Sequence, residues 1–301
     1  MAVDDHLLHA RGLRPHGAAP IDIISIQSQV VYGHAGNSAA VEPLRALGLR
    51  VAEIPTTLLS NAPVYSTTRG RVLPADWFGD LLRGVRERGL PGRARMVLSG
   101  YLGSASNGEA LANWLQEVLP VCPQLRFCLD PVLGDSHTGV YVEPGLPKLV
   151  RDRLLRHAWL LTPNVFELGL LCGHGCVRED ECLAAARDLL RTGPQWVVVH
   201  GIPDAGNMLV TLAVSARASY RVASPQLPID VTGTGDVLAA MLVGFLLRGE
   251  AFPRALQRSI AGVHGALEET LRAQYEELEV QLAAPAALAA NIDQFAAVRI
   301  T

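Results

Sequence analysis

The stretch Thr232-Gly233-Thr234-Gly235-Asp236-Val237 is a glycine-rich turn that runs directly into an apolar segment ending at residue 247. Apolar residues at positions 237, 238, 241, 242, 245 and 246 follow helical spacing, and Arg248-Gly249 is typical of a helix end. The turn therefore predicts a helix N-terminus, where free N–H groups and the helix dipole attract anions. Asp236 has two interpretations. It is either a first-turn acid favoured by the dipole, or a base that takes a proton from a hydroxyl attacking phosphorus.

Length and composition indicate a globular protein with a large core. The chain has 301 residues, of which 49% are hydrophobic, and a net charge of −3, which gives no indication of nucleic-acid binding. Its longest apolar stretch is too short to cross a membrane. Residues 1–20 carry charges and lack the apolar segment of a signal peptide. We therefore expect a flexible extension over 1–20, one domain over 21–301 and a cytoplasmic location.

Lysine and cysteine usage excludes several site types. Lys148 is the only lysine, so the chain has no Gly-Lys-Ser/Thr phosphate loop. Any nucleotide phosphates would then be bound by backbone amides, by a metal held on carboxylates, or by arginine. The five cysteines are an odd number, which argues against a disulfide framework. Cys172 and Cys176 flank His174 but have no second ligand pair, so ordinary thiols are the favoured interpretation.

Strand-like and helical segments alternate along the chain. The expected strands cover 21–27, 49–54, 94–99, 125–130, 159–161, 196–200, 208–215 and 220–223, the last two as a hairpin. The expected helices cover 36–47, 74–89, 107–119, 164–172, 179–191, 237–247, a segment from 253 onward, and an alanine-rich tail at 283–297. This alternation predicts an α/β fold with a mainly parallel sheet covered on both faces.

Polar residues stand where the predicted strands end. They are Gln27-Ser28, Ser99-Gly100-Tyr101, Asp130-Pro131, Thr162-Pro163-Asn164 and His200-Gly201. Ligands of such sheets bind beyond the carboxyl ends of the strands. The sequence therefore predicts a site at this edge, shared with the glycine turn.

Several of these residues have an ordinary structural interpretation as well. Asn164 and Glu167 have the spacing of a capping box, yet Glu167 and Asp130 could also orient a hydrated Mg²⁺. Both roles can hold together. Asn37 or Ser38 is the expected cap of the helix that begins near Gly36. Asp135 is expected to begin a turn with Gly134, and His34 is read as a loop histidine outside the site.

Seven motifs occur in order over about residues 20 to 250. They are 25-SIQSQVVYG-33, 36-GNSA-39, 58-LLSN-61, 99-SGYLG-103, 130-DPVLGD-135, 162-TPNVFE-167 and 233-GTGD-236. Together they resemble the pyridoxal kinases of the ribokinase superfamily. The Gly-x-Gly-Asp element is shared by the superfamily, whereas the first block is specific to pyridoxal kinases. The resemblance implies a three-layer α/β/α ribokinase-like fold with a mainly parallel central sheet.

The resemblance also implies an activity. It predicts ATP-dependent phosphorylation of the 5′-hydroxymethyl group of pyridoxal, pyridoxine or pyridoxamine. Asp236 would be the base, and the amides of Gly233, Thr234 and Gly235 would hold the transferred phosphoryl group. The resemblance implies that the vitamer contacts Ser28, Tyr101 and Val64. It implies that ATP contacts Thr162, Asn164, Glu167, His200 and Thr232. Mg²⁺ would lie near Asp130, Tyr141 and Glu167. Residues 62–70 would form a flap, and the protein would be a homodimer.

Three positions depart from the family pattern. Ala62-Pro63-Val64 replaces a segment that often carries a substrate-contacting His or Thr. His200 stands where Thr, Ser or Lys is common, and an imidazole would donate a hydrogen bond with pH-dependent strength. Thr232 stands where some relatives have lysine. Hydroxymethylpyrimidine kinase and a non-catalytic vitamer-binding protein are the alternatives. The sequence leaves open the preferred vitamer and any need for K⁺ or Na⁺.

Overall fold

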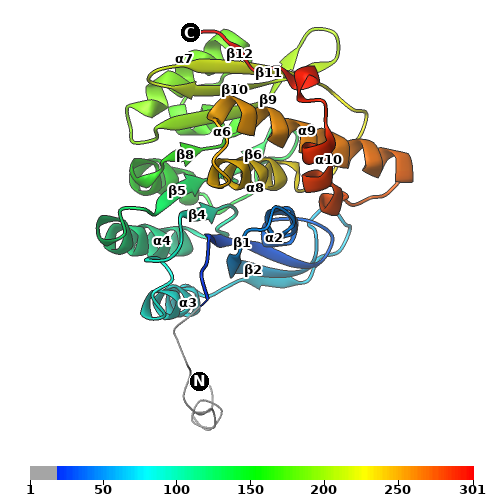
Figure 1. Ribbon diagram of the computed structural model, residues 1–301. Coiled ribbons are helices and arrows are strands. Elements are labelled where there is room, and N and C mark those ends of the chain that lie inside the picture. The colour runs from blue at the N-terminus through cyan, green and yellow to red at the C-terminus, as the bar shows by residue number, and fades with distance from the viewer. Residues whose placement is uncertain (1–18) are drawn as a thin grey trace.

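The computed structural model describes residues 19–301, and its centre is a ten-stranded sheet (Figure 1). Six parallel strands form its middle, in the order β2 (Val51–Asn61), β1 (Ile23–Tyr32), β4 (Met96–Ser99), β5 (Arg126–Leu129), β8 (Leu160–Leu161) and β9 (Trp196–Asp204). Antiparallel strands complete the edges, namely β3 (Gly70–Val72) beside β2, and β10 (Met208–Ser215), β11 (Ser219–Pro225) and β12 (Val298–Arg299) beyond β9. The predicted parallel sheet and the β10–β11 hairpin are confirmed.

Helices cover both faces of this sheet, each over its own hydrophobic core. One core is covered by α3 (Ala75–Glu87), α4 (Ala105–Val118), α6 (Val165–Cys172) and α7 (Glu179–Leu190). The other is covered by α2 (Asn37–Ala46), α8 (Thr234–Leu247), α9 (Phe252–Ala273) and α10 (Ala283–Ala289). In Figure 1, α3 and α4 lie at the left and α9 and α10 at the right. The strand period of two explains the division, because Ile24 and Ile26 of β1 enter the first core and Ile23 the second. The predicted three-layer fold is confirmed.

Some elements differ from the sequence prediction. The first two strands are longer than expected, since β1 runs to Tyr32 and β2 to Asn61. The short strands β3, β6 (Gly134–Asp135) and β7 (Gly139–Val140) were missed. The continuous helix expected over 283–297 is wrong. Helix α10 ends at Ala289, a 3-10 turn at Ile292–Phe295 follows, and β12 then pairs with β11. Without β12, the outer edge of β11 would have unpaired backbone N–H and C=O groups. A strand at this position satisfies them, whereas a continued helix could not.

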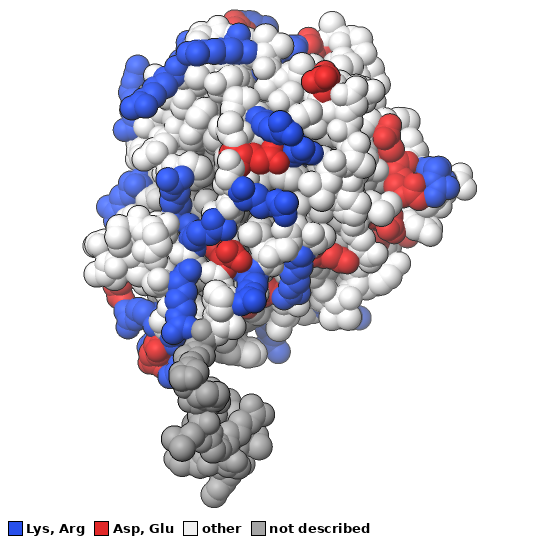
Figure 2. All heavy atoms as spheres, viewed as in Figure 1, with Lys and Arg blue, Asp and Glu red and all other residues white. Residues whose placement is uncertain are grey.

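The described part of the chain begins at residue 19, and its surface carries charges of both signs. Of the extension expected over residues 1–20, all but residues 19 and 20 lie outside the described part of the chain. The C-terminus lies beside β12 (Figure 1). Figure 2 shows one face of the molecule, on which Lys and Arg side chains lie beside Asp and Glu. Within residues 19–301, no helix combines the length and the apolar character needed to span a membrane.

Candidate active site

The glycine turn leads into α8 as predicted. The helix begins at Thr234, and its first internal hydrogen bond runs from the N–H of Val237 to the carbonyl of Gly233, over 2.9 Å. Gly233 has φ = +93°, and a Cβ there would lie 2.5 Å from the carbonyl oxygen of His34. Only glycine fits this conformation and this approach. The amides that open α8 are therefore held against the β1–α2 loop, at the positive end of the helix dipole.

Asp236 is held by that same loop, residues 33–36. Its Oδ2 accepts a hydrogen bond of 2.9 Å from the N–H of Gly36. Gly36 has φ = +57°, and a Cβ there would collide with the carbonyl and hydroxyl oxygens of Ser28. Burial of the carboxylate raises the pKa of Asp236 to about 6, against a lowering by the Gly36 N–H. Asp236 is thus ionised at neutral pH and basic enough to accept a proton.

Ser28 lies where the sheet opens. Strand β4 pairs with β1 only as far as Ser99 opposite Ile26, whereas β1 and β2 continue together to Tyr32 opposite Asn61. The register between these two strands shifts between Gln27 and Gln29, so Ser28 lies at the irregularity. One side of β1 is therefore free of strand pairing from this point on. Ser28 itself lies against Gly36 of the loop which holds Asp236.

A buried polar network supports this strand end. The Ser25 hydroxyl donates to Asn37 Oδ1 over 2.7 Å, and the Gln27 amide donates to the Ser25 hydroxyl over 3.0 Å. Neither Asn37 nor Ser38 caps α2, so that prediction is wrong. The N-cap is Gly36, which makes no side-chain cap, and the Ser38 hydroxyl donates to the carbonyl of Val30. Asn37 is fully buried, and its amide is used to satisfy other buried groups instead.

Two tyrosines predicted to line the site lie near each other. The ring centroids of Tyr101 and Tyr141 are 6.4 Å apart and tilted by 37°. Burial raises the pKa of Tyr101, and burial followed by the charge of Glu167 raises that of Tyr141, so both hydroxyls stay protonated. Val64 lies on the segment between β2 and β3 and is 60% exposed. Its contact with a substrate stays a prediction.

Acidic residues gather beyond β5 and β8. Asp130 directly follows β5, and its Oδ1 accepts a hydrogen bond of 3.0 Å from the Thr162 hydroxyl. Glu167 lies in the first turn of α6 and accepts the N–H groups of Leu133 and Asn164, each over 2.9 Å. The Asn164 side chain in turn accepts the N–H of Glu167. The predicted capping box is confirmed, and it fixes Glu167 in place.

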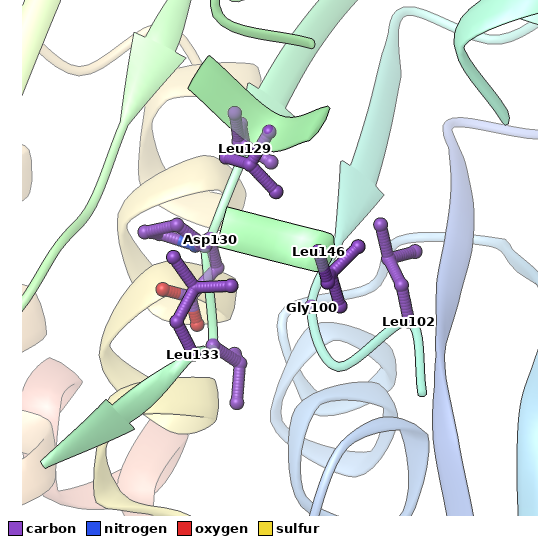
Figure 3. Close-up of a pocket in the computed structure, with 9 residues that line it drawn as sticks. Gly100, Leu102, Leu129, Asp130, Leu133 and Leu146 are labelled. Carbon is purple, nitrogen blue, oxygen red and sulfur yellow. The ribbon is translucent and has the colours of Figure 1, made fainter. Parts of the chain in front are cut away.

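The surroundings of these acids favour their neutral forms. Asp130 borders a narrow pocket that is otherwise lined by glycine and apolar residues, among them Leu102, Leu133 and Leu146 (Figure 3). Burial and the charges of Glu167 and Asp236 raise the pKa of Asp130 well above its ordinary value. Burial raises the pKa of Glu167 to about 7, although three backbone N–H groups oppose that shift. The three carboxylates therefore repel one another, a condition that a cation would relieve.

A larger cavity adjoins the glycine turn. It has about 920 Å³ of empty space, counting its open mouth, and reaches from Thr234 and Gly235 to α9. Its apolar lining residues are Leu209, Leu227, Ile229, Val231, Leu238, Ile260, Val263 and Leu267. An anion site next to an apolar cavity suits a ligand with a phosphate chain and a flat base. The sequence reasoning missed this wall, although the apolar residues in the loop before Thr232 were a usable signal.

His200 lines the same cavity beside the turn. A Cβ on Gly235 would lie 3.7 Å from Cε1 of the imidazole. Burial lowers the pKa of His200 to about 4, so the ring is neutral throughout the physiological range. The expected pH-dependent hydrogen bond therefore does not apply near pH 7. Thr232 directly precedes the turn, and its role toward ATP stays a prediction.

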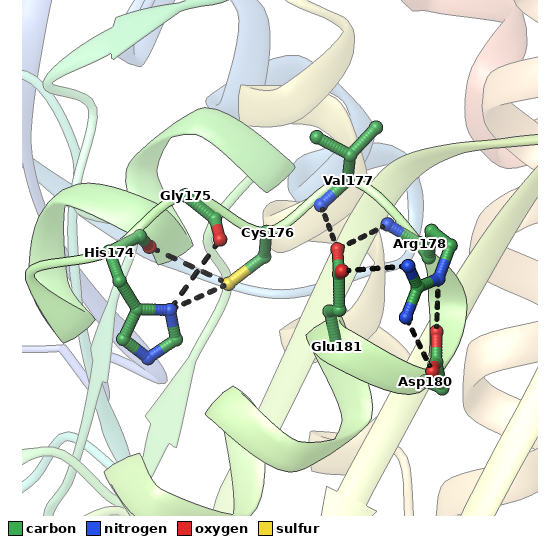
Figure 4. Close-up of polar contacts among 7 residues, drawn as sticks. All are labelled: His174, Gly175, Cys176, Val177, Arg178, Asp180 and Glu181. Carbon is green, nitrogen blue, oxygen red and sulfur yellow. Dashed lines mark hydrogen bonds and ion pairs between the residues drawn. The ribbon is translucent and has the colours of Figure 1, made fainter.

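The remaining sequence motifs lie outside this site. Figure 4 shows Cys176 beside His174, with 3.8 Å between Sγ and Nδ1, in the loop between α6 and α7. Burial raises the pKa of Cys172 to about 11 and that of Cys182 to about 12, so these sulfurs remain thiols. In residues 19–301, no three His, Cys, Asp or Glu side chains are grouped as a metal cage. Asp135 accepts the N–H groups of His137 and Thr138, which confirms its predicted turn.

Comparisons with known proteins show the family of this chain. The family model described as phosphomethylpyrimidine kinase matches residues 32–281. A pyridoxal kinase of Rubrobacter xylanophilus is 41% identical over 264 residues, which cover 86% of this chain and 91% of that protein. A pyridoxine/pyridoxal/pyridoxamine kinase of Bordetella avium is 41% identical over 260 residues, which cover 85% of this chain and 88% of that protein.

Solved structures show the same fold. The pyridoxal kinase of Leishmania donovani in complex with ADP and pyridoxamine has a TM-score of 0.85 and 26% identity, with 92% of this chain and 98% of that chain covered. The pyridoxal kinase of Entamoeba histolytica, at 22% identity, has a TM-score of 0.86 with 94% and 100% covered. The chain therefore belongs to the pyridoxal kinases, within the broader phosphomethylpyrimidine kinase family.

Proposed function

We propose that this protein transfers the γ-phosphoryl group of ATP to the 5′-hydroxymethyl group of pyridoxal, pyridoxine or pyridoxamine in vitamin B6 salvage. The products are ADP and the corresponding 5′-phosphate, which is pyridoxal 5′-phosphate when pyridoxal is the substrate. The observation that carries the proposal is the placement of Asp236, with a pKa of about 6, at the N-terminal amides of α8 and beside the open end of β1. The relatives that are 41% identical carry the same activity in their names.

The residues suggest how the reaction proceeds. The vitamer ring would bind between Ser28 and Tyr101, with Val64 above it on the flap. Asp236 would accept the hydroxyl proton as the oxygen attacks phosphorus. The amides of Gly233, Thr234 and Gly235 would hold the charge on the transferred group, a contribution of about 3 kcal/mol per donor in comparable sites. ATP would occupy the apolar cavity that adjoins the glycine turn, with Thr162, Asn164, His200 and Thr232 toward its phosphates.

The acids fit Mg²⁺ bound together with ATP. Asp130 and Glu167 are buried, repel each other and have raised pKa values, so a cation between them and the phosphates would stabilise their ionised forms. Tyr141 lies near the same charges. A hydrated Mg²⁺ needs few protein carboxylates and neutralises phosphate charge.

The first experiment measures pyridoxal 5′-phosphate from pyridoxal and Mg-ATP for the wild type, Asp236→Ala and Asp236→Asn. We expect both variants to lose turnover by about 10²–10⁴-fold, because general-base catalysis contributes that much. Their affinity for ATP should stay close to that of the wild type, since Asp236 contacts the acceptor. Unchanged turnover in either variant would contradict the proposed base. Binding of pyridoxal by the wild type without ATP consumption would instead support a vitamer-binding protein.

Hydroxymethylpyrimidine is the second candidate substrate, because the matching family model is described as phosphomethylpyrimidine kinase, and that name contains the same ring type. The two rings carry a similar hydroxymethyl group and compete for the same pocket. A competition assay with both rings decides between them. We expect a higher kcat/KM for the B6 vitamer.

We further propose that the protein is a cytoplasmic homodimer, as the resemblance implies. The exposed apolar side chains of Val31 and Leu58 lie on adjacent strands, β1 and β2, and provide a surface for such contact. A salvage kinase draws on the ATP of the cytoplasm, which supports that location.

A further inference from the structure

Glu277 lies outside every motif of the sequence and yet reaches the loop that holds Asp236. It follows α9 in a tightly fixed turn, in which Gln274 adopts φ = +57° and the N–H of Glu279 donates to the Thr270 hydroxyl over 2.9 Å. The neighbouring Leu278 is fully buried. The backbone that carries Glu277 is therefore held on both sides, and the carboxylate has a defined position.

The carboxylate of Glu277 rests on the start of loop 33–36. Its Oε2 accepts a hydrogen bond of 3.0 Å from the N–H of His34. Gly33 has φ = +83°, and a Cβ there would collide with the same carboxylate. Two residues later, the N–H of Gly36 holds Asp236. One short loop thus has Glu277 at its first end and the proposed base at its second.

The predicted flap, residues 62–70, also contacts Glu277, through Tyr65. Tyr65 of the flap lies over Tyr32, with ring centroids 5.8 Å apart, and contact with Glu277 is the main cause that raises the pKa of the Tyr65 hydroxyl. The base of the flap is fixed, because the N–H of Ala62 donates to the carbonyl of Tyr32 and the Asn61 amide donates to that of Thr67.

Buried polar atoms without a hydrogen-bond partner come together at this point. They are the hydroxyl of Tyr65, Oε1 of Glu277 and Nδ1 of His34. A buried group left without a partner costs about 1–3 kcal/mol. The Tyr65 hydroxyl already interacts with the Glu277 carboxylate, which is the main cause of its raised pKa, but neither atom makes a hydrogen bond of full geometry. A better aligned Tyr65–Glu277 hydrogen bond would satisfy two of these atoms. The arrangement therefore favours a further closing step.

We propose that Glu277 is a positioning residue that couples closure of the flap, through Tyr65, to the loop that holds Asp236. This inference rests on the proposed kinase function. Closure over a bound vitamer would complete the Tyr65–Glu277 hydrogen bond, and the His34 N–H would pass the constraint to Gly36 and the base. The closed flap excludes water, which would otherwise accept the phosphoryl group and give ADP and inorganic phosphate.

The test compares Tyr65→Phe, Glu277→Gln, the double variant and Glu277→Ala, with Glu276→Gln as the matched control, because Glu276 is the exposed neighbour. ADP and phosphorylated vitamer are measured in the same reaction, together with the KM for pyridoxal. We expect wild type and Glu276→Gln to form about one ADP per phosphorylated vitamer. Tyr65→Phe and Glu277→Gln should raise that ratio and raise the KM severalfold, and the double variant should match the stronger single variant.

Glu277→Ala separates the two contacts. It removes the acceptor for the His34 N–H as well, so kcat should fall at least tenfold further than in Glu277→Gln, whose amide oxygen can still accept that bond. Unchanged ratio and KM in both Tyr65→Phe and Glu277→Gln, or additive effects in the double variant, would overturn the coupling. If a Glu277 variant unfolds at lower temperature than the control, Tyr65→Phe alone decides. A wild type that forms no phosphorylated vitamer would instead contradict the proposed function.

Discussion

At the scale of single residues, the environment of Asp236 sets the pH dependence of the reaction. Burial raises its pKa to about 6, and the base must be ionised to accept a proton. The active fraction of free enzyme therefore falls as the pH drops through about 6 and is nearly complete above pH 7. Burial raises the pKa of Glu167 to about 7, and the charge of Asp236 adds to that rise.

We expect kcat/KM for pyridoxal, measured from pH 5 to pH 8, to decline toward the acidic end with a midpoint near 6. No such decline should come from His200, because the pKa of that ring is about 4. His200→Gln is the matched control, and it should keep the same midpoint. A flat profile over this range would show that the free enzyme has no base with the pKa expected of Asp236.

Gly36 is a second residue whose identity the site requires. Gly36→Ala would add a left-handed penalty of about 1–2 kcal/mol and a collision with Ser28, and it would displace the N–H that holds Asp236. Gly48→Ala is the matched control, because Gly48 also has a positive φ, of +82°, but has no atom within 4 Å of the added Cβ. Both variants should lose stability in thermal unfolding, whereas only Gly36→Ala should lose turnover, by tenfold or more. Equal turnover in the two would mean that the Gly36 contact is dispensable.

At the scale of secondary-structure elements, the caps of two helices separate stability from function. Asn164 caps α6 and also donates to the carbonyl of Gly134, whereas Ser104 caps α4 by accepting the N–H of Asn107. Replacing either cap by alanine should cost about 1 kcal/mol of unfolding free energy. Only Asn164→Ala should also raise the KM for Mg-ATP severalfold, because it loosens the turn that carries Glu167. Denaturant unfolding and steady-state kinetics check both parts, and an equal KM effect from Ser104→Ala would contradict the argument.

The elements also show how far sequence reasoning reaches. Helices such as α7 and α8 were located to within a few residues because their apolar spacing is long and regular. The glycine turn and the capping box were readable because local chemistry decides them. The two-residue strands β6 and β7 have too few residues to show any period. Asn37 was misassigned as a cap because its partners, Ser25 and the carbonyl of Ile54, are distant in sequence.

The candidate site was predictable to a similar extent. Asp130, Glu167 and Asp236 follow strand ends or a helix start, so parallel topology alone brings them to one edge. Glu277 had no such signal. Its contact with His34 joins residues 243 positions apart. The contact depends on how the chain after α9 packs against loop 33–36, which connects β1 and α2. Contacts of this kind arise from tertiary packing, and no local pattern records them.

At the scale of the whole molecule, the ends of β1 and β2 form a two-stranded ribbon, residues 29–32 and 58–61, that continues past the end of β4. After β4 ends, β1 and β2 continue as a pair with β3 at the outer edge. Val31 is 90% exposed on this ribbon, and the flap follows at the end of β2. Exposed apolar side chains that lie close together mark association surfaces more often than scattered ones do. The ribbon is thus the part of the molecule where a dimer contact would also restrain the flap.

The proposed homodimer can be tested on that ribbon with a matched pair of variants. Val31→Glu places a charge on the ribbon, whereas Val121→Glu places one on another exposed valine, which is 75% exposed after α4. Burying an unpaired carboxylate at an interface is costly, so Val31→Glu should shift the wild-type dimer toward monomer in analytical ultracentrifugation, and Val121→Glu should not. If the dimer also steadies the flap, the monomeric variant should show a higher KM for pyridoxal with little change in thermal stability. A wild type that sediments as a monomer would contradict the homodimer, and a dimeric Val31→Glu would place its interface elsewhere.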